Sequence, residues 1–409
     1  MPNNTPQEKK TQVVKAEKNS NDYLRIKIGI FLTGLSVFAQ LYLFQPLLPE
    51  LSREYNITPE YSSLAVSAGT IGMALGLFVL AFRADRVPRK NLMVMSIISA
   101  SILTILTSFS THFDVVIILC FLKGLALSGV TAVALAYLSE EVSIGILGVA
   151  IALYLSGNTI GGMLGRVMSL LIASQSNWHT SVLIIGIFCL VLGLIFTKIF
   201  PASRNFKPQY DGFSYKLQLM KTFLSDKYLL ALFFIGFSVM GSFVSIYNYL
   251  GFRLEAAPFN LPHSLIACVF LMYTIGVLGS MRAGKWSDTY SSKKIIWAMI
   301  ALEILGLSLM FSNSIFVMVL GLGAVTFSFF AAHTLASRMV SQRAIEGKST
   351  ATCLYWLFYY CGSSFIGSAS GEILTDMGWK GFIFALIGLM IISLVLSLWI
   401  RNFTLKKIQ

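Results

Sequence analysis

The chain has 409 residues, of which 56% are apolar and only 12% are charged, and its formal net charge is +13. Soluble domains contain roughly 25% charged residues, so a soluble protein of this composition would expose large apolar patches and aggregate. The composition therefore excludes an ordinary soluble enzyme and a disordered chain. The basic residues lie between apolar runs rather than in one patch, which argues against nucleic acid as a partner.

Long apolar runs repeat along the chain, and a helix needs roughly 20 such residues to cross a bilayer. Six runs precede the polar stretch 201–227 and six follow it, which predicts two six-helix bundles, 26–200 and 228–401, joined by a cytoplasmic linker. Residues 1–25 and 402–409 are predicted to be cytoplasmic tails, the first of them disordered. The predicted helices are 26–48, 62–82, 91–110, 114–138, 143–173, 179–200, 228–250, 263–283, 295–312, 315–338, 349–373 and 380–401.

The distribution of lysine and arginine supports this number of helices. With both termini in the cytoplasm, all but five of the 31 Lys and Arg residues fall in cytoplasmic segments, as the positive-inside rule requires. The sequence therefore predicts a multi-pass protein of the cell membrane, in contact with the lipid bilayer, with both ends cytoplasmic. The exceptions are Arg53, Arg253 and Lys380 in the opposite loops, and Lys123 and Arg166 within predicted helices.

Small residues recur every four positions in the second and fifth predicted helices of each half. Such stripes let helix backbones approach closely, and their presence in four helices suggests surfaces on which the halves move against each other. The glycines concerned are Gly72, Gly76, Gly157, Gly161, Gly165, Gly276, Gly367 and Gly371.

A second repeat lies in the loop after the second helix of each half. In both copies an Asp is followed by basic residues, and a carboxylate beside such residues and a helix N-terminus is stabilised. We interpret the two loops as a cytoplasmic gate that holds while the halves are together. Its predicted residues are Asp85, Arg86, Arg89 and Lys90 in the first copy, and Gly284, Asp288 and Lys293 in the second.

The first of these loops, Ala84-Asp85-Arg86 with Arg89-Lys90, resembles motif A of the major facilitator superfamily. The strings Tyr42-Leu43-Phe44-Gln45-Pro46 and Tyr137-Leu138-Ser139-Glu140-Glu141 resemble the YnfM-like, acriflavine-sensitivity branch of bacterial efflux proteins. The superfamily resemblance covers about residues 26–401. It implies an all-α membrane protein with twelve transmembrane helices in two parallel six-helix repeats. It also implies secondary transport by alternating access, commonly coupled to protons.

Ionisable residues inside membrane spans are costly, so each is a functional candidate. Arg166 and Lys123 are candidates for substrate binding or gating, with a structural ion pair as the competing interpretation. Many proton antiporters of the superfamily carry an Arg where this chain has Cys120, three residues before Lys123. Glu303 and His333 are candidates for carrying protons, with interhelical hydrogen bonding as the alternative.

Polar and aromatic residues on the first and fifth predicted helices of each half form a further group of candidates. The resemblance implies that these helices line a central cavity. Such side chains suit a ligand that is partly apolar and has a few hydrogen-bonding groups. They are Tyr42, Gln45, Asn158, Tyr247, Asn248, Tyr355 and Tyr359.

The sequence therefore predicts a transporter and not an enzyme, with no cofactor and no metal site. It lacks a phosphate-binding GxxxxGK[ST] loop, metal-ligand spacing and a nucleophile elbow. The main hypothesis is proton-coupled export of a small amphipathic molecule or drug by a monomer. Uptake or exchange of a small anionic metabolite is the first alternative, favoured by Lys123 and Arg166. A polytopic sensor or lipid-handling protein that transports nothing small is the second.

Overall fold

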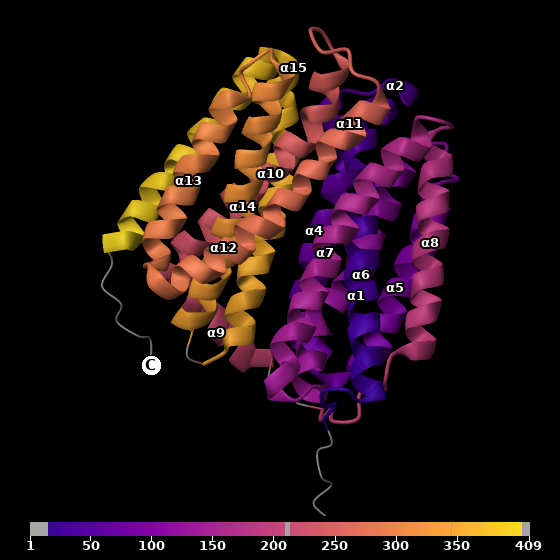
Figure 1. Ribbon diagram of the computed structural model, residues 1–409, viewed down its shortest axis with the longest axis vertical. Helices are drawn as coiled ribbons and strands as arrows, with labels where there is room; N and C mark the ends of the chain where they lie inside the picture. The colour runs from indigo at the N-terminus through magenta and orange to yellow at the C-terminus, as the bar shows by residue number, and fades with distance from the viewer. Residues whose placement is uncertain (1–14, 209–212, 345, 403–409) are drawn as a thin grey trace, which may run out of the picture.

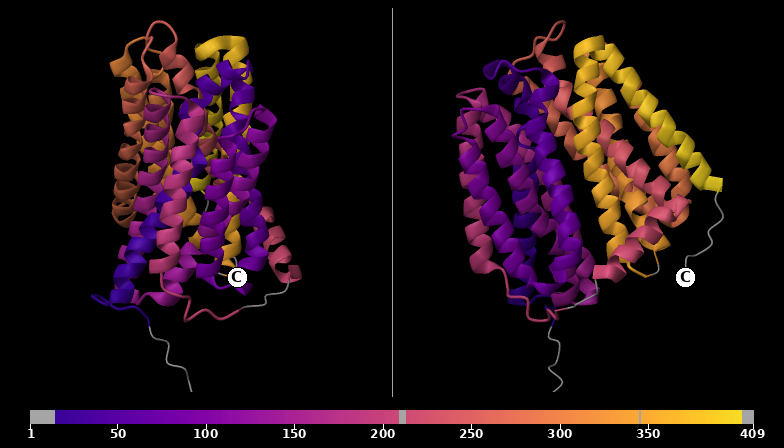
Figure 2. Two further views of the ribbon diagram at one scale, coloured as in Figure 1. Left: turned by 90° about the vertical axis from the view of Figure 1, so that its right-hand side faces the viewer. Right: turned by 180° about the vertical axis from the view of Figure 1, so that it is seen from behind.

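The computed structural model describes residues 15–208, 213–344 and 346–402, and this part of the chain is almost entirely helical. Figures 1 and 2 show two helical bundles side by side, the first half in indigo to magenta and the second in orange to yellow. The N-terminal bundle contains α1 (Asn21–Tyr42), η1 (Gln45–Leu47), α2 (Leu48–Glu54), α3 (Pro59–Ser62), α4 (Leu64–Arg83), η2 (Ala84–Arg86), α5 (Arg89–Thr107), α6 (Phe113–Glu141), α7 (Ile144–Ala173) and α8 (Trp178–Ile199).

The second bundle follows a short helix, α9 (Phe213–Ser225), that lies in the stretch predicted as a linker. Its elements are α10 (Lys227–Glu255), α11 (His263–Phe270), η3 (Leu271–Thr274), α12 (Ile275–Thr289), α13 (Ser292–Leu309), α14 (Ile315–Arg343) and α15 (Lys348–Asn402).

Ten helices of the described residues are long and apolar enough to cross a membrane. One of them, α15, contains two spans, because Gly378 interrupts it with a φ of 66° that favours glycine. The helix α13 adds another span, which carries Lys293, Lys294 and Glu303 among its 18 residues. The predicted fold of twelve transmembrane helices is thereby confirmed.

The two ends of the molecule differ in what they carry. We call the end that carries α9 and η2, at the bottom of Figure 1, the linker end, and the end that carries α2 and the start of α11 the distal end. At the linker end, α1 begins five residues earlier than predicted, because Ser20 Oγ accepts a hydrogen bond from Tyr23 N at 3.1 Å. The predicted tails, except for 15–25 and 402, lie outside the described residues.

The glycine stripes of the first half pack helices within one bundle. A Cβ atom at Gly157, Gly161 or Gly165 would lie 2.2–2.4 Å from a backbone oxygen of α1, so α7 contacts α1 backbone to backbone. Gly72 and Gly76 bring α4 equally close to α6. The expectation that these stripes form surfaces between the halves is therefore wrong, because their close contacts are all internal to the N-terminal bundle.

The stripes of the second half have more varied neighbours. Gly276 lies against the ring of Phe330 on α14, and Gly367 faces the side chain of Val244 on α10. Gly371 is enclosed by the Tyr249 hydroxyl of α10 and by the backbone of α3, so it reaches the other bundle.

Hydrogen bonds between the two bundles cluster at the distal end in the described part of the chain. Ser368 of α15 donates to Ser67 Oγ of α4 at 2.6 Å and accepts from Ser63 Oγ at 3.1 Å. Arg53 of α2 forms an ion pair with Glu255 of α10 at 2.5 Å. We call these five residues the distal seal.

Candidate functional site

Arg166 lies on α7 with its side chain fully buried. Its Nε donates to Gln45 Oε1 and its Nη1 donates to the Gly162 carbonyl oxygen, both at 2.6 Å. The guanidinium carbon lies 4.5 Å from the ring centroid of Tyr42 and 4.6 Å from that of Tyr273. We call these residues the Arg166 box.

The Arg166 box stabilises a cation without neutralising it. Each aromatic face contributes about 0.5–2 kcal/mol through the cation–π interaction. Among the described residues, Nη2 of Arg166 has no hydrogen-bond partner and no carboxylate lies within 4.0 Å of the guanidinium. A buried charge without a counter-ion costs several kcal/mol. The box therefore leaves a positive charge and a free donor for an anion.

Two further candidates of the sequence analysis meet this box from the second bundle. Gln45 Nε2 donates to Asn248 Oδ1 of α10 at 2.7 Å. The Tyr247 ring centroid lies 5.7 Å from the Arg166 guanidinium, and its hydroxyl shares a hydrogen bond of 2.9 Å with Thr326 of α14. The structure thus brings Arg166, Gln45, Tyr42, Tyr247 and Asn248 together.

Tyr273 is the member of the box that sequence reasoning missed. It lies in η3, a turn of 3₁₀ helix between α11 and α12. A 3₁₀ turn rotates the following residues relative to an α-helix, so extrapolating one helical period along 263–283 does not predict where the side chain points. The sequence held a weaker signal, a phenol group in the middle of an apolar run.

His333, Tyr355 and Tyr359 lie at the other end of an aromatic series that begins at the box. The ring centroid of His333 is 4.6 Å from that of Tyr359, and its Nδ1 is hydrogen-bonded to the Tyr355 hydroxyl at 2.9 Å. Rings at centroid distances of 5.0–6.0 Å connect Tyr273 to His333. We call the series Tyr273, Phe330, Phe329, His333 and Tyr359 the aromatic wall.

The other ionisable candidates lie apart from the box. Lys123 is buried on α6 with its Nζ 5.0 Å from the ring centroid of Phe44, inside the N-terminal bundle. Glu303 is buried on α13 beside Ser242, inside the C-terminal bundle. Neither Lys123 Nζ nor the Glu303 carboxylate has a hydrogen-bond partner in the described part. The structure therefore places Lys123 apart from Arg166, although the sequence analysis interpreted both as candidates for the same role.

Asn158 lies one helical turn before Gly162 on α7 and faces α1. A Cβ atom at Gly34 of α1 would lie 2.5 Å from Asn158 Oδ1, and this oxygen has no hydrogen-bond partner among the described residues. In the same part of the chain, no group of three or more His, Cys, Asp or Glu side chains is placed to hold a metal ion.

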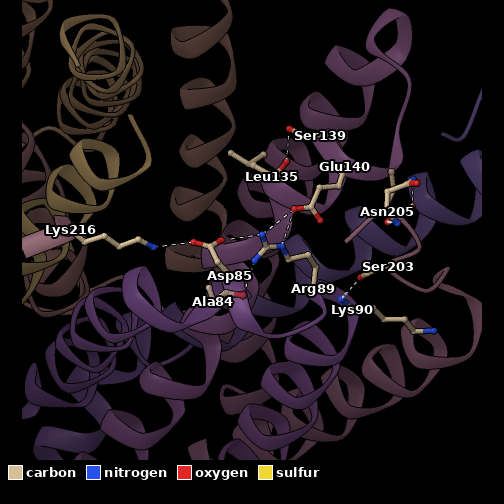
Figure 3. Close-up of polar contacts among 11 residues, drawn as sticks. Ala84, Asp85, Arg89, Lys90, Leu135, Ser139, Glu140, Ser203, Asn205 and Lys216 are labelled. Carbon is tan, nitrogen blue, oxygen red and sulfur yellow. Dashed lines mark hydrogen bonds and ion pairs between the residues drawn. The ribbon is translucent and has the colours of Figure 1, made fainter. Parts of the chain in front are cut away.

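The first copy of the predicted gate forms a connected set of ion pairs, drawn in Figure 3. Asp85 accepts from Arg89 Nη2 at 3.1 Å and from Lys216 Nζ of α9 at 3.0 Å. Arg89 also donates to Glu140 Oε1 of α6 at 3.0 Å and to the Ala84 carbonyl oxygen at 2.7 Å. This loop is therefore tied to α6 and to the helix that leads into the second bundle.

The remaining residues of the predicted gate differ in their contacts and in their exposure. Lys90 Nζ donates to the Phe200 carbonyl oxygen at 2.5 Å, whereas Arg86 is exposed. In the second copy, Asp288 is 73% exposed and pairs with Arg338 at 3.7 Å. Lys293 lies 5.7 Å from a ring centroid, that of Tyr228, and a Cβ atom at Gly284 would meet no atom within 4 Å.

The comparisons with known proteins agree on one family. A model of the Major Facilitator Superfamily matches residues 30–344. An uncharacterised transporter of Buchnera aphidicola is 38% identical, over 94% of each chain, and the inner membrane transport protein YnfM of Escherichia coli is 35% identical, over 93% of this chain and 91% of its own. The benzoate transport protein of Acinetobacter baylyi is 26% identical, over 83% and 79%. A bacterial homologue of the human lysosomal transporter Spinster, crystallised inward-facing and occupied, has the same fold, with a TM-score of 0.74, 12% identity and coverage of 95% and 98%.

Proposed function

We propose that this chain, which belongs to the Major Facilitator Superfamily and is a secondary transporter, carries small amphipathic organic anions by alternating access. The observation that supports this substrate class is Arg166, a buried guanidinium with a free Nη2 and no carboxylate within 4.0 Å in the described part. An anionic head group bound there would supply the missing counter-ion and accept the free hydrogen bond.

The surroundings of Arg166 favour an apolar body on the same substrate. The aromatic wall extends from Tyr273 to Tyr359 and His333 and presents a continuous series of ring contacts. Ligand sites of this kind bind the apolar part by contact area and the polar part by a few placed groups. The relative from Acinetobacter baylyi, described as a benzoate transport protein, adds support for an aromatic carboxylate.

The same charge disfavours cationic drugs. Two positive charges about 5 Å apart repel by roughly 3 kcal/mol at an effective dielectric constant of about 20. This is a loss of about 100-fold in affinity. The proposal therefore narrows the amphipathic substrate expected from the sequence to its anionic members.

Benzoate and benzamide form a matched pair of probes, because they differ in charge and share the ring. We expect the purified protein in proteoliposomes to bind and transport radiolabelled benzoate. Replacing Arg166 with Gln should weaken benzoate binding about 10- to 100-fold, the contribution of hydrogen bonds to a charged group. Arg166→Lys should retain part of the affinity, because it keeps a point charge without the bidentate geometry.

Lys123→Gln is the matched control, since it also removes a buried cation but lies inside the N-terminal bundle beside Phe44. We expect its benzoate affinity to stay within about twofold of the wild type. Equal binding of benzoate and benzamide by the wild type, or unchanged benzoate binding in a folded Arg166→Gln variant, would refute the proposed substrate class.

Proton-driven export is a second component of the proposed function. His333 supports it, because this imidazole is part of the aromatic wall and shares a hydrogen bond with Tyr355. A pH-sensitive dye inside the liposomes should report proton movement on addition of benzoate, and a protonophore should abolish benzoate accumulation. The response should be lost in His333→Gln if His333 carries the proton, and in Glu303→Gln if Glu303 does. Transport that is indifferent to the pH gradient would exclude proton coupling.

A further inference from the structure

Gln45 is a single side chain that contacts the cation of one bundle and a polar group of the other. Its Oε1 accepts from Arg166 Nε at 2.6 Å, and its Nε2 donates to Asn248 Oδ1 at 2.7 Å and to the Val244 carbonyl oxygen at 3.3 Å. Asn248 Nδ2 in turn donates to the Gly367 carbonyl oxygen at 3.2 Å. The three polar side chains of this series are at most 1% exposed.

The local sequence explains why Gln45 reaches both bundles. The helix α1 ends at Tyr42, and η1 begins with Gln45 followed by Pro46. Proline lacks an N–H group and cannot continue the hydrogen bonding of the preceding helix. The regular α-helix is therefore interrupted at this point and continues as α2, which packs on α10 where a Cβ atom at Gly251 would lie 3.0 Å from Pro49 Cγ.

We propose that Gln45 is a positioning residue that couples occupation of the Arg166 box to opening of the distal end. This inference rests on the proposed function, since it requires an anion at Arg166. A carboxylate prefers to bind two guanidinium nitrogens at once. One of these is the free Nη2, and the second is either Nε, held by Gln45, or Nη1, held by the Gly162 carbonyl oxygen.

The Nε side is the one that an anion can take. The Gly162 oxygen belongs to the backbone of α7, the same helix as Arg166, and cannot withdraw without distorting that helix. Gln45 Oε1 belongs to a side chain, and it is a neutral acceptor competing with a charged one. A bound carboxylate therefore displaces Gln45, and Gln45 then loses the contact that orients its amide toward Asn248.

Loss of this contact weakens the closure of the distal end. Alternating access requires the halves to separate there, and the Gln45–Asn248 hydrogen bond joins the halves. The distal seal also joins the halves, but the described contacts of its five residues do not include Arg166. Arg166 also contacts the rings of Tyr273 and Tyr247 of the second bundle, but among the described hydrogen bonds between the bundles, those of Gln45 are the ones made by a side chain that also bonds Arg166.

Hydrogen–deuterium exchange of the full-length protein in lipid nanodiscs measures this opening. The reporting segments are α2 and the loop 256–262, which lie on opposite bundles at the distal end. We expect saturating benzoate to raise exchange in both segments of the wild type. In Gln45→Met, which keeps the side-chain length, exchange should be raised without benzoate and should not rise further when benzoate is added.

Benzoate affinity in the same samples is a second readout. If Gln45 had only a structural role, its replacement would not tighten benzoate binding. Gln45→Met removes the acceptor that competes for Arg166 Nε, so we expect benzoate to bind about 2- to 10-fold more tightly. The maximal transport rate should fall, because binding no longer changes the distal closure. Weaker binding together with an unchanged transport rate would overturn the proposal.

Ser368→Ala is the matched control for general weakening of the distal end. It removes the two hydrogen bonds to Ser63 and Ser67, so its exchange should start higher and still rise with benzoate. A benzoate-induced rise in Gln45→Met equal to that of the wild type would overturn the coupling role. The coupling role would also be overturned if benzoate no longer raised exchange in Ser368→Ala, because any contact between the halves would then have the same effect as Gln45. A wild type that binds no benzoate refutes the proposed substrate class and this inference with it, whereas binding without a change in exchange refutes the inference alone.

Discussion

The two copies of the loop after the second helix of each bundle have similar sequences and very different surroundings. In the first copy Arg89 is buried and donates to Asp85, Glu140 and the Ala84 carbonyl oxygen. In the second copy Asp288 is 73% exposed, with one ion pair of 3.7 Å. Part of the difference lies within the loops, because the position four residues after the Asp is Arg89 in the first copy and Ser292 in the second.

The ends of the neighbouring helices differ as well. The helix α6 ends near Glu140, which accepts from Arg89, whereas the corresponding helix α14 ends near Arg338 and Arg343. Arg343 pairs instead with Asp226 at 2.9 Å, and both side chains are 7% exposed. A repeated loop thus keeps its ion pairs where its own arginine and the complementary charge on the neighbouring helix are both present.

The largest effect should come from Asp226, which carries the buried ion pair of the second bundle. Asp226 Oδ1 also accepts from the N–H groups of Tyr228 and Leu229, so it caps α10. Removing one partner of a buried ion pair is strongly destabilising, and we expect Asp226→Ala to lower the free energy of unfolding by about 4 kcal/mol. Chemical unfolding in detergent micelles measures this change.

Asp226→Asn is its control, because it keeps the capping oxygen and loses the charge. It should recover about 1 kcal/mol of the loss, the usual contribution of an N-cap. Equal destabilisation by the two variants would mean that the cap contributes nothing here.

A smaller effect is expected at the first copy of the loop. Arg89→Met removes the hydrogen bonds to Asp85, Glu140 and Ala84, but the two carboxylates are 33% and 25% exposed and can be hydrated. We expect a loss of about 2 kcal/mol in the same unfolding measurement. Arg83→Met, an exposed arginine in the same stretch, should change stability by less than about 0.5 kcal/mol. If both variants were equally stable, the ion pairs drawn in Figure 3 would not hold the loop.

The smallest effect belongs to the second copy. Asp288→Asn should alter the free energy of unfolding by at most about 0.5 kcal/mol, since exposed ion pairs contribute little. Unchanged stability of Asp288→Asn would support the contrast between the two loops. Destabilisation as large as that of Arg89→Met would contradict it.

The fold was predictable because each membrane span is a long apolar run and because basic residues gather on one side of the runs. The helix α9 was not predicted, since it is a short helix within a polar stretch. The pairing of Asp226 with Arg343 was also missed, although the Asp stands just before α10 where a capping residue is expected. Its partner lies more than one hundred residues away, and no local pattern connects them.

The candidate site was predictable in its residue types and only partly in its grouping. Arg166 and Lys123 have the same signature in the sequence, a cation within an apolar helix. Packing alone separates them, since Arg166 meets Tyr42 and Tyr273 while Lys123 meets Phe44. Glu303 is a second example. Its place in an apolar helix predicts that it is buried, but the sequence does not predict that it lies apart from the Arg166 box.

The glycines and the arginine of α7 also bear on how the protein is made. The span of α7 has a mean hydropathy of 1.6, against 2.7 for α8, and Arg166 within it adds up to roughly 2.5–3.5 kcal/mol to the cost of insertion, the value for an arginine at a helix centre. The helix α1 leaves the ribosome long before α7 and carries both the backbone that receives the glycines and Tyr42, which stacks on Arg166. We therefore expect α7 to enter the bilayer against an already inserted α1, so that biosynthesis itself assembles the first half of the site.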